Sequence, residues 1–180
     1  MIGVLVSGEG TNLQALLDED LPVVAVASNV RGARALERAR AAGVATAVFA
    51  LDRYVDRDAR DLAMAAWLGE QGVELVVCAG YMQLLRPGFL ERFPGRVINV
   101  HPAPLPEFPG ARPLEDVLAA GAPEAAATVH YVDEGVDTGA VIASERVAVA
   151  PGDTVETLRA RVHEAEHRLL PAVVRELCAR

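Results

Sequence analysis

Lysine is absent from this chain of 180 residues, and all 17 of its strongly basic residues are arginine. The absence excludes Schiff-base catalysis by lysine and the lysine of a Walker-type phosphate loop. Acidic residues number 25, so the formal net charge is -8. Because nucleic-acid backbones bind clustered positive charge, this balance argues against a nucleic-acid partner and favours small-molecule ligands.

Cysteine is scarce as well, with Cys78 in an apolar run and Cys178 near the end of the chain. This pair offers neither metal-ligand spacing nor a disulfide framework. Although 52% of the residues are hydrophobic, no apolar run approaches the roughly 18 residues that a membrane span needs. The opening residues MIGVLVSG lack the basic start and long apolar centre of a signal peptide. We therefore expect a soluble, cytoplasmic protein that does not contact a membrane.

Apolar runs alternate with segments of helical spacing through the first hundred residues. The expected strands are Ile2–Val6, Pro22–Ala27, Thr46–Ala50, Leu75–Ala79 and Val97–Val100. The expected helices are 13–17, 34–42 and 56–70, and the helix 56–70 carries Leu62, Ala66 and Trp67 on one side. A helical turn is expected at Phe89–Phe93. This alternation predicts an α/β fold with a doubly wound, mostly parallel sheet, whose ligands bind at the carboxyl ends of the strands.

The remaining residues predict a short helix at Leu114–Ala120, a strand at Ala126–Val132 and a second strand at Ala140–Val149 that returns antiparallel. His130 is interpreted as a half-buried structural histidine in the first of these strands. A final helix, capped by Asp153 or Thr154, should run towards Arg175 with a break or kink at Pro171. One domain covering residues 1–180 is the natural expectation at this length.

A glycine-rich loop, SGEGTN, follows the first strand and precedes a helix. Gly8 and Gly10 allow close backbone approach, and Thr11 and Asn12 add donors at a helix N-terminus, where backbone N–H groups favour an anion. The loop is no Walker motif, because GK[ST] is absent. It is a poor dinucleotide fingerprint, because Leu13 replaces the third glycine. The alternative to a phosphate loop is a plain strand-to-helix turn.

The stretch VINVHPAPLPEFPG predicts a buried strand that leads into a stiff, proline-rich loop. Asn99 and His101 lie two apart on this strand, so their side chains should emerge on the same side. An amide donor beside a proton carrier suits acyl transfer, in which an oxyanion needs a fixed donor and the attacking amine loses a proton. Asp137, in a glycine-flanked loop, is a candidate to hold the imidazole. A strand-end cap is the alternative reading of Asn-x-His.

The string N-x-H-P-x-x-L-P-x-x-x-G, followed by a D-x-G loop, resembles the folate-dependent formyltransferases. The resemblance implies a Rossmann-like fold with a C-terminal antiparallel strand and helix, and a catalytic trio of Asn99, His101 and Asp137. It implies 10-formyltetrahydrofolate as co-substrate, with no metal. The folate-binding residues that it implies are Arg57, Met82, Gln83, Leu84, Leu85, Asn99 and Val132, and the loop Met82–Leu85 would line the pterin pocket largely through backbone groups.

Within that superfamily, the SGEGTNL loop resembles the phosphate loop of the members that formylate glycinamide ribonucleotide in purine biosynthesis. On this resemblance Gly10, Thr11, Asn12 and Glu166 bind the ribonucleotide, in a monomer or a homodimer. Two alternatives stay open. One is a related enzyme that formylates an amino sugar nucleotide, and the other is a non-catalytic nucleotide-binding module.

Several positions depart from the pattern of these relatives. Gln83 stands in place of an arginine, Ala103 and Pro104 replace a serine and a leucine, and Arg112 replaces a histidine. None of these changes touches the trio, but they alter the expected substrate contacts. The segment HEAEH contains histidines at i and i+4, yet the sequence offers no obvious third ligand for a metal.

Overall fold

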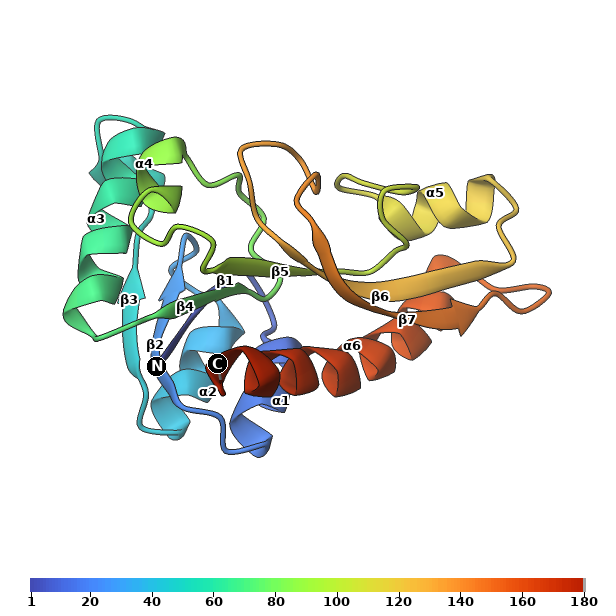
Figure 1. Ribbon diagram of the computed structural model, residues 1–180, viewed down its shortest axis with the longest axis horizontal. Coiled ribbons are helices and arrows are strands. Elements are labelled where there is room, and N and C mark those ends of the chain that lie inside the picture. Colours follow the sequence, from blue (N-terminus) through green and yellow to red (C-terminus); the bar gives the residue numbers. More distant parts are fainter. Residues whose placement is uncertain (180) are drawn as a thin grey trace. The chain divides into compact units, whose positions relative to one another are not determined.

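The computed structural model describes residues 1–179 (Figure 1). Its strands are β1 (Ile2–Val6), β2 (Val23–Ser28), β3 (Ala45–Val48), β4 (Leu75–Cys78), β5 (Val97–His101), β6 (Glu124–Tyr131) and β7 (Val141–Ala148). They are hydrogen-bonded in the order β3-β2-β1-β4-β5-β6-β7, which confirms the predicted doubly wound sheet with an antiparallel C-terminal side. The helices are α1 (Thr11–Asp18), α2 (Arg34–Ala41), the 3₁₀ turn η1 (Leu51–Arg53), α3 (Arg57–Glu70), α4 (Pro87–Leu90), α5 (Pro113–Ala119) and α6 (Val155–Cys178).

The chain divides into two compact units, Met1–Ile98 and a second that begins at Asn99. The expected single domain over residues 1–180 stays a prediction. In the first unit β1 pairs in parallel with both β2 and β4. The strand order therefore reverses between β1 and β4, and such a switch point is where doubly wound sheets bind ligands. Leu5 of β1 lies opposite Cys78 of β4, so the loops that follow these strands leave the sheet at the same edge.

The side of α3 that carries Leu62, Ala66 and Trp67 is only partly covered. Leu62 is 46% exposed and Ala66 is also exposed, whereas Trp67 is partly buried and packs against Phe49. The residues that α3 buries are Arg60, Asp61, Met64, Ala65 and Leu68. Arg60 and Asp61 have the adjacent charges of a solvated face, yet both side chains are inside and paired with each other at 2.7 Å.

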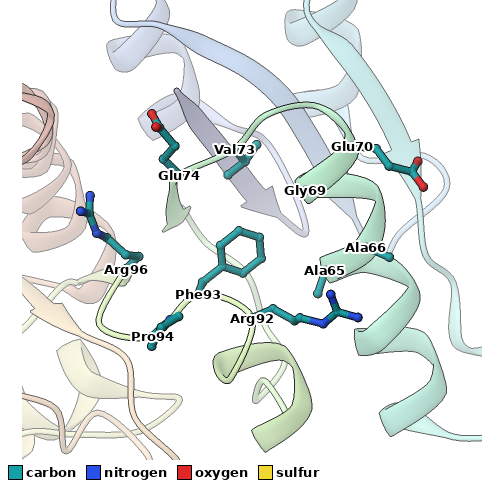
Figure 2. A pocket seen from close by; sticks show the side chains of 10 residues that line it. All are labelled: Ala65, Ala66, Gly69, Glu70, Val73, Glu74, Arg92, Phe93, Pro94 and Arg96. Atoms are coloured by element: carbon teal, nitrogen blue, oxygen red, sulfur yellow. The ribbon is translucent and has the colours of Figure 1, made fainter.

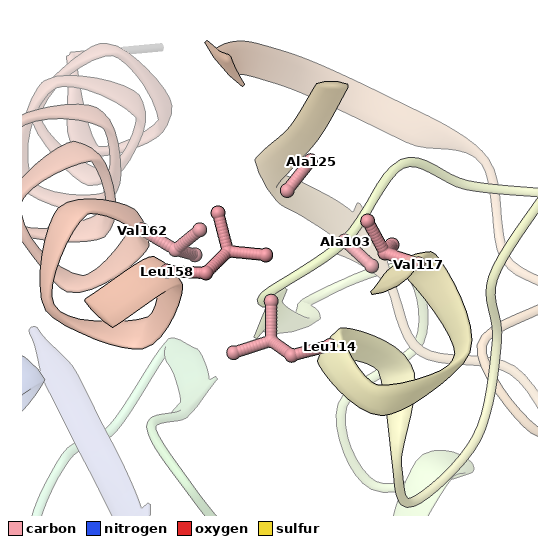
Figure 3. Close-up of a cluster of buried hydrophobic side chains, with 6 residues drawn as sticks. All are labelled: Ala103, Leu114, Val117, Ala125, Leu158 and Val162. Carbon is pink, nitrogen blue, oxygen red and sulfur yellow. The ribbon is translucent and has the colours of Figure 1, made fainter. Parts of the chain in front are cut away.

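In the second unit β6 and β7 form an antiparallel pair, and α6 packs on both strands (Figure 1). A cluster of buried apolar side chains joins α5, β6 and α6 (Figure 3): Ala103, Leu114, Val117, Ala125, Leu158 and Val162. Helix α6 starts at a capping box between Thr154 and Thr157 and continues through Pro171, so the predicted interruption is wrong, and a kink there stays a prediction. An internal proline costs about 3 kcal/mol. Full burial of Leu170 and Val174 beside it offsets that cost.

A hollow of about 660 Å³ lies on the first unit, between the end of α3 and the segment Arg92–Arg96 (Figure 2). The negative charges of Glu70 and Glu74 on its walls are matched in number by the positive charges of Arg92 and Arg96. None of the predicted site residues lines it. Over residues 1–179, every helix is too short or too polar to span a bilayer.

Candidate active site

Asp137 lies in the tight loop between β6 and β7 and has a left-handed backbone, with φ at 53°. Thr138 helps to close this loop, because its Oγ1 donates to Oδ1 of Asp133 at 2.6 Å. Gly139 is required for a steric reason: a Cβ there would lie 1.8 Å from the carbonyl oxygen of Tyr131. The D-x-G pattern therefore holds the Asp137 carboxylate in one place.

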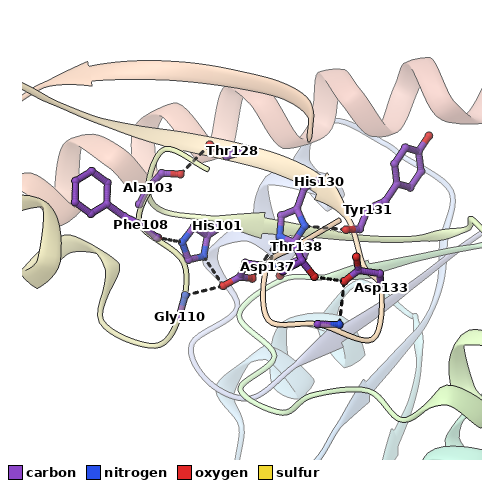
Figure 4. Close-up of polar contacts among 12 residues, drawn as sticks. His101, Ala103, Phe108, Gly110, Thr128, His130, Tyr131, Asp133, Asp137 and Thr138 are labelled. Carbon is purple, nitrogen blue, oxygen red and sulfur yellow. Dashed lines mark hydrogen bonds and ion pairs between the residues drawn. The ribbon is translucent and has the colours of Figure 1, made fainter. Parts of the chain in front are cut away.

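His101 is the last residue of β5 and is 4% exposed. Its Nδ1 lies 3.5 Å from Oδ2 of Asp137, and its Nε2 lies 2.7 Å from the carbonyl oxygen of Phe108 (Figure 4). A carbonyl only accepts, so Nε2 must donate the hydrogen. The backbone N–H of Gly110 donates to the same Asp137 oxygen at 2.9 Å. Both ring nitrogens thus face acceptors, which stabilises an imidazolium once a proton arrives on Nδ1.

Burial lowers the pKa of His101 below its ordinary value, although the Phe108 carbonyl and Asp137 oppose that shift. The Asp137 carboxylate acts to raise this pKa, but desolvation is the larger effect. For Asp137, partial burial favours the neutral acid, yet its pKa is lowered because the Gly110 N–H donates to the carboxylate and positive charge on either neighbouring imidazole, His101 or His130, stabilises it. At neutral pH the pair therefore rests as an uncharged imidazole beside a carboxylate.

His130 is only 2% exposed, not half-buried as predicted, and it contacts two members of the trio. Its Nδ1 lies 2.8 Å from the Tyr131 carbonyl, which makes Nδ1 the donor. In the neutral ring Nε2 is then an acceptor, 3.1 Å from Nδ2 of Asn99. Nε2 also lies 3.5 Å from Oδ1 of Asp137 (Figure 4). If the Asn99 amide were reversed, its Oδ1 would face the acceptor Nε2 of His130. His130 therefore fixes the orientation in which Nδ2 of Asn99 faces the imidazole.

Sequence reasoning therefore missed His130 as a member of this polar cluster. The sequence feature that could have revealed His130 is its spacing from Thr128, because two polar residues that lie two apart on a strand share a face. Thr128 Oγ1 donates to the Ala103 carbonyl at 2.8 Å, next to the Asn99–His101 strand end. Ala103, where relatives of the expected pattern carry serine, is fully buried in the apolar cluster of this unit.

The predicted phosphate loop lies in the first unit. Gly10 is the N-cap of α1, with φ at 73°, and a Cβ there would lie 2.5 Å from the Cβ of Ala35. The α2 helix holds this loop, since the Ala35 N–H donates to the Gly8 carbonyl and Arg38 Nε donates to the Glu9 carbonyl. Because no side chain caps α1, its first-turn N–H groups are directed out of the helix, in the orientation that binds anions. Thr11 and Asn12 open this turn.

The predicted folate residues are divided between the units. In the first unit, Arg57 opens α3 at the surface, Met82 and Leu84 are 71% and 53% exposed, and Leu85 is buried at 7%. Gln83 donates to the Met82 carbonyl at 2.9 Å, within its own loop. In the second unit, Val132 follows β6 and is partly buried.

The predicted ribonucleotide residue Glu166 is on α6 in the second unit. It is 3% exposed, and its Oε2 lies 3.9 Å from Nε2 of His163. The structure thus brings Asn99, His101 and Asp137 together, and adds His130. It places Gly10, Thr11 and Asn12 together at the N-terminus of α1 in the first unit.

Comparison with known proteins agrees with these observations. The family model described as formyl transferase matches residues 1–174. The chain is 46% identical to the phosphoribosylglycinamide formyltransferase of Mycobacterium tuberculosis, over 97% of this chain and 83% of that protein. It is 42% identical to the trifunctional purine biosynthetic protein adenosine-3 of Drosophila pseudoobscura over 94% of this chain, but spans only 13% of that protein's length.

Among solved structures, the phosphoribosylglycinamide formyltransferase of Streptococcus pneumoniae superposes with a TM-score of 0.93 at 43% identity, covering 98% of this chain and 97% of that one. The glycinamide ribonucleotide transformylase 1 of Symbiobacterium toebii gives 0.94 at 46% identity, covering 97% and 85%. With a matching family model over almost the whole chain and relatives of this identity, the chain belongs to the formyl transferase family.

Proposed function

We propose that the chain transfers the formyl group of 10-formyltetrahydrofolate to the amine of glycinamide ribonucleotide, a step of purine biosynthesis. The observation that carries the proposal is the connected cluster of amide, imidazoles and carboxylate formed by Asn99, His130, Asp137 and His101. Relatives that carry the name of this activity, at 38% and 46% identity over most of both chains, support the choice of acceptor.

In the proposed reaction the amine nitrogen forms a bond to the formyl carbon, and the carbonyl electron pair moves onto oxygen. An amide nitrogen carries two hydrogens, so Asn99 can donate one to His130 and the other to that oxyanion. His101 rests neutral and accepts the amine's proton at Nδ1, where the Asp137 carboxylate stabilises the resulting charge. The carbon–nitrogen bond to the folate then breaks, and His101 returns the proton to the departing nitrogen.

Residues of both units have binding roles in this proposal. The N-terminus of α1, from Gly10 to Asn12, binds the phosphate of the ribonucleotide, and Glu166 binds its ribose or amine side. The segment Met82–Leu85 and Arg57 bind the folate, and Val132 completes that set. Exposure of Met82 and Leu84 fits this role, because a loop that keeps apolar side chains at the surface is available to a flat heterocycle.

The test is a deformylation assay. Purified protein is mixed with 10-formyltetrahydrofolate, and formation of tetrahydrofolate is followed by absorbance with and without glycinamide ribonucleotide. We expect release that depends on the nucleotide and that falls about 10²- to 10⁴-fold in His101→Ala, the range for a lost acid–base group. Unchanged turnover in both His101→Ala and Asp137→Ala would overturn the assignment of these residues.

Other outcomes separate the alternatives. Release without nucleotide would indicate a hydrolase. Folate binding without release would indicate a different acceptor, and an amino sugar nucleotide would be tried next. Nucleotide binding without folate binding, measured by calorimetry, would indicate a non-catalytic module.

A further inference from the structure

The segment Gly80–Arg86, which we call the donor loop, is fastened at its start by Ser7. The Ser7 N–H donates to the Gly80 carbonyl at 3.1 Å, and the Met82 N–H donates to Ser7 Oγ at 2.9 Å. The Ser7 hydroxyl in turn donates to Oδ1 of Asn29 at 2.6 Å. Because Ser7 donates its hydroxyl hydrogen to Asn29, a lone pair of Oγ is available to accept the Met82 N–H. The two hydroxyl bonds and the backbone bond to Gly80 can therefore form at the same time.

The end of the donor loop is fastened by Asp61. Its Oδ2 accepts the backbone N–H of Arg86 at 2.9 Å, while its Oδ1 accepts from Nε of Arg60 at 2.8 Å. The side chains of Arg60 and Asp61 are 1% and 0% exposed. Asp58 binds the same Arg86 at the surface, through the guanidinium at 3.0 Å, and both of these side chains are about half exposed.

The buried pair needs a reason beyond stability. Adjacent residues of a helix do not normally face each other, and burying two charges costs free energy that apolar residues of similar size would not cost. Apolar residues, however, have no acceptor for the Arg86 N–H. The pair holds that acceptor in place, because Arg60 neutralises and orients the carboxylate of Asp61.

Between its two anchors the donor loop is directed outward, with Met82 and Leu84 exposed and Tyr81 and Leu85 buried. Backbone groups recognise a flat heterocycle well only when they already point the right way, because ordering a loop on binding costs affinity. We propose that Ser7 and Asp61 are positioning residues that fix the donor loop for the folate substrate. This inference rests on the proposed function, since it takes the donor loop as part of the folate site.

The first test compares two serines at the ends of neighbouring strands. Ser7→Ala removes the acceptor of Met82. Ser28→Ala is the matched control, because Ser28 Oγ accepts the Val30 N–H at 3.0 Å at the end of β2, outside the donor loop. We expect Ser7→Ala to raise the Kd for 10-formyltetrahydrofolate about 5- to 20-fold, the range for one or two lost hydrogen bonds, and to change the Kd for glycinamide ribonucleotide less, although Ser7 is also the first residue of the predicted phosphate loop. Equal folate affinity in the two variants would overturn the role of Ser7.

The second test separates the Asp61 acceptor from its charge. Asp61→Asn alone would leave Arg60 charged and unpaired in the interior, so both residues are changed together. Arg60→Met with Asp61→Asn keeps an oxygen for the Arg86 N–H, whereas Arg60→Met with Asp61→Leu has a similar volume and no acceptor. Asp58→Asn controls for the surface contact.

We expect the Asn-containing pair to bind 10-formyltetrahydrofolate within about 3-fold of the wild type, and the Leu-containing pair to bind at least about tenfold more weakly. Melting temperatures confirm that both variants fold, and calorimetry with the ribonucleotide confirms that the loss is specific to folate. Equal folate affinity in the two folded variants would overturn the role of Asp61. A wild-type protein that does not bind folate would instead refute the proposed function.

Discussion

The Nε2 atom of His130 is the acceptor that fixes the orientation of the Asn99 amide. His130→Ala should therefore lower kcat about 10- to 100-fold, less than the full loss of an oxyanion donor, with little change in the KM for the ribonucleotide. Steady-state kinetics test this prediction. Thr128→Val is the matched control, because Thr128 lies on the same strand as His130. The change removes the buried hydrogen bond from Thr128 to the Ala103 carbonyl and leaves the contacts of Asn99 intact. It should cost stability but not turnover, and wild-type turnover in His130→Ala would show that Asn99 needs no support.

The pairing of Asp137 with His101 predicts a pH dependence. The pKa of His101 is already lowered by burial, and Asp137 is one of the groups that oppose the shift. In Asp137→Asn the opposing charge is gone, so the pKa of His101 should fall further. Because His101 must be neutral to accept the amine's proton, the acid limb of the kcat/KM profile should then move to lower pH. The plateau value of kcat/KM should be lower than in the wild type. Titration of the His101 ring by NMR checks the sign. A His101 pKa that rises in this variant would contradict the assignment of the 3.5 Å contact as favourable to the cation.

At the scale of elements, sequence periodicity predicted β1 and α2 to within a residue, because apolar runs and a glycine stop signal are local features. It misplaced α4, which begins at Pro87 rather than near Phe89, although proline favours the first turn of a helix. It also missed the buried face of α3 and the continuity of α6 through Pro171. Both depend on tertiary partners, a buried ion pair in one case and apolar packing in the other.

At the scale of the whole molecule, the boundary between the two compact units falls inside β5, between Ile98 and Asn99. Glycine-, proline- or serine-rich linkers mark many domain boundaries, but here the boundary lies within an apolar strand and the proline-rich loop starts only at Pro102. The proximity of Asn99, His101 and Asp137 could be predicted because the Asn-x-His motif is local in sequence and the D-x-G loop is recognisable, whereas their catalytic role stays a prediction. The anchors of the donor loop could not be predicted, because Ser7 and Asp61 are 75 and 25 residues distant from their backbone partners.

Because a ligand that binds only the folded protein stabilises the whole chain, thermal unfolding reports on both substrates. At a concentration of about 100 Kd a ligand adds about 2.7 kcal/mol, which for a chain of this size raises Tm by roughly 5–10 °C. We expect glycinamide ribonucleotide and 10-formyltetrahydrofolate each to produce such a shift, measured by calorimetric scanning, whereas inorganic phosphate at the same ionic strength should produce less. If only the ribonucleotide raised Tm, the chain would bind nucleotide without acting as a transferase. A folate shift that falls by roughly a third to three fifths in Ser7→Ala at the same ligand concentration, as a 5- to 20-fold higher Kd requires, would instead tie stabilisation to the donor loop.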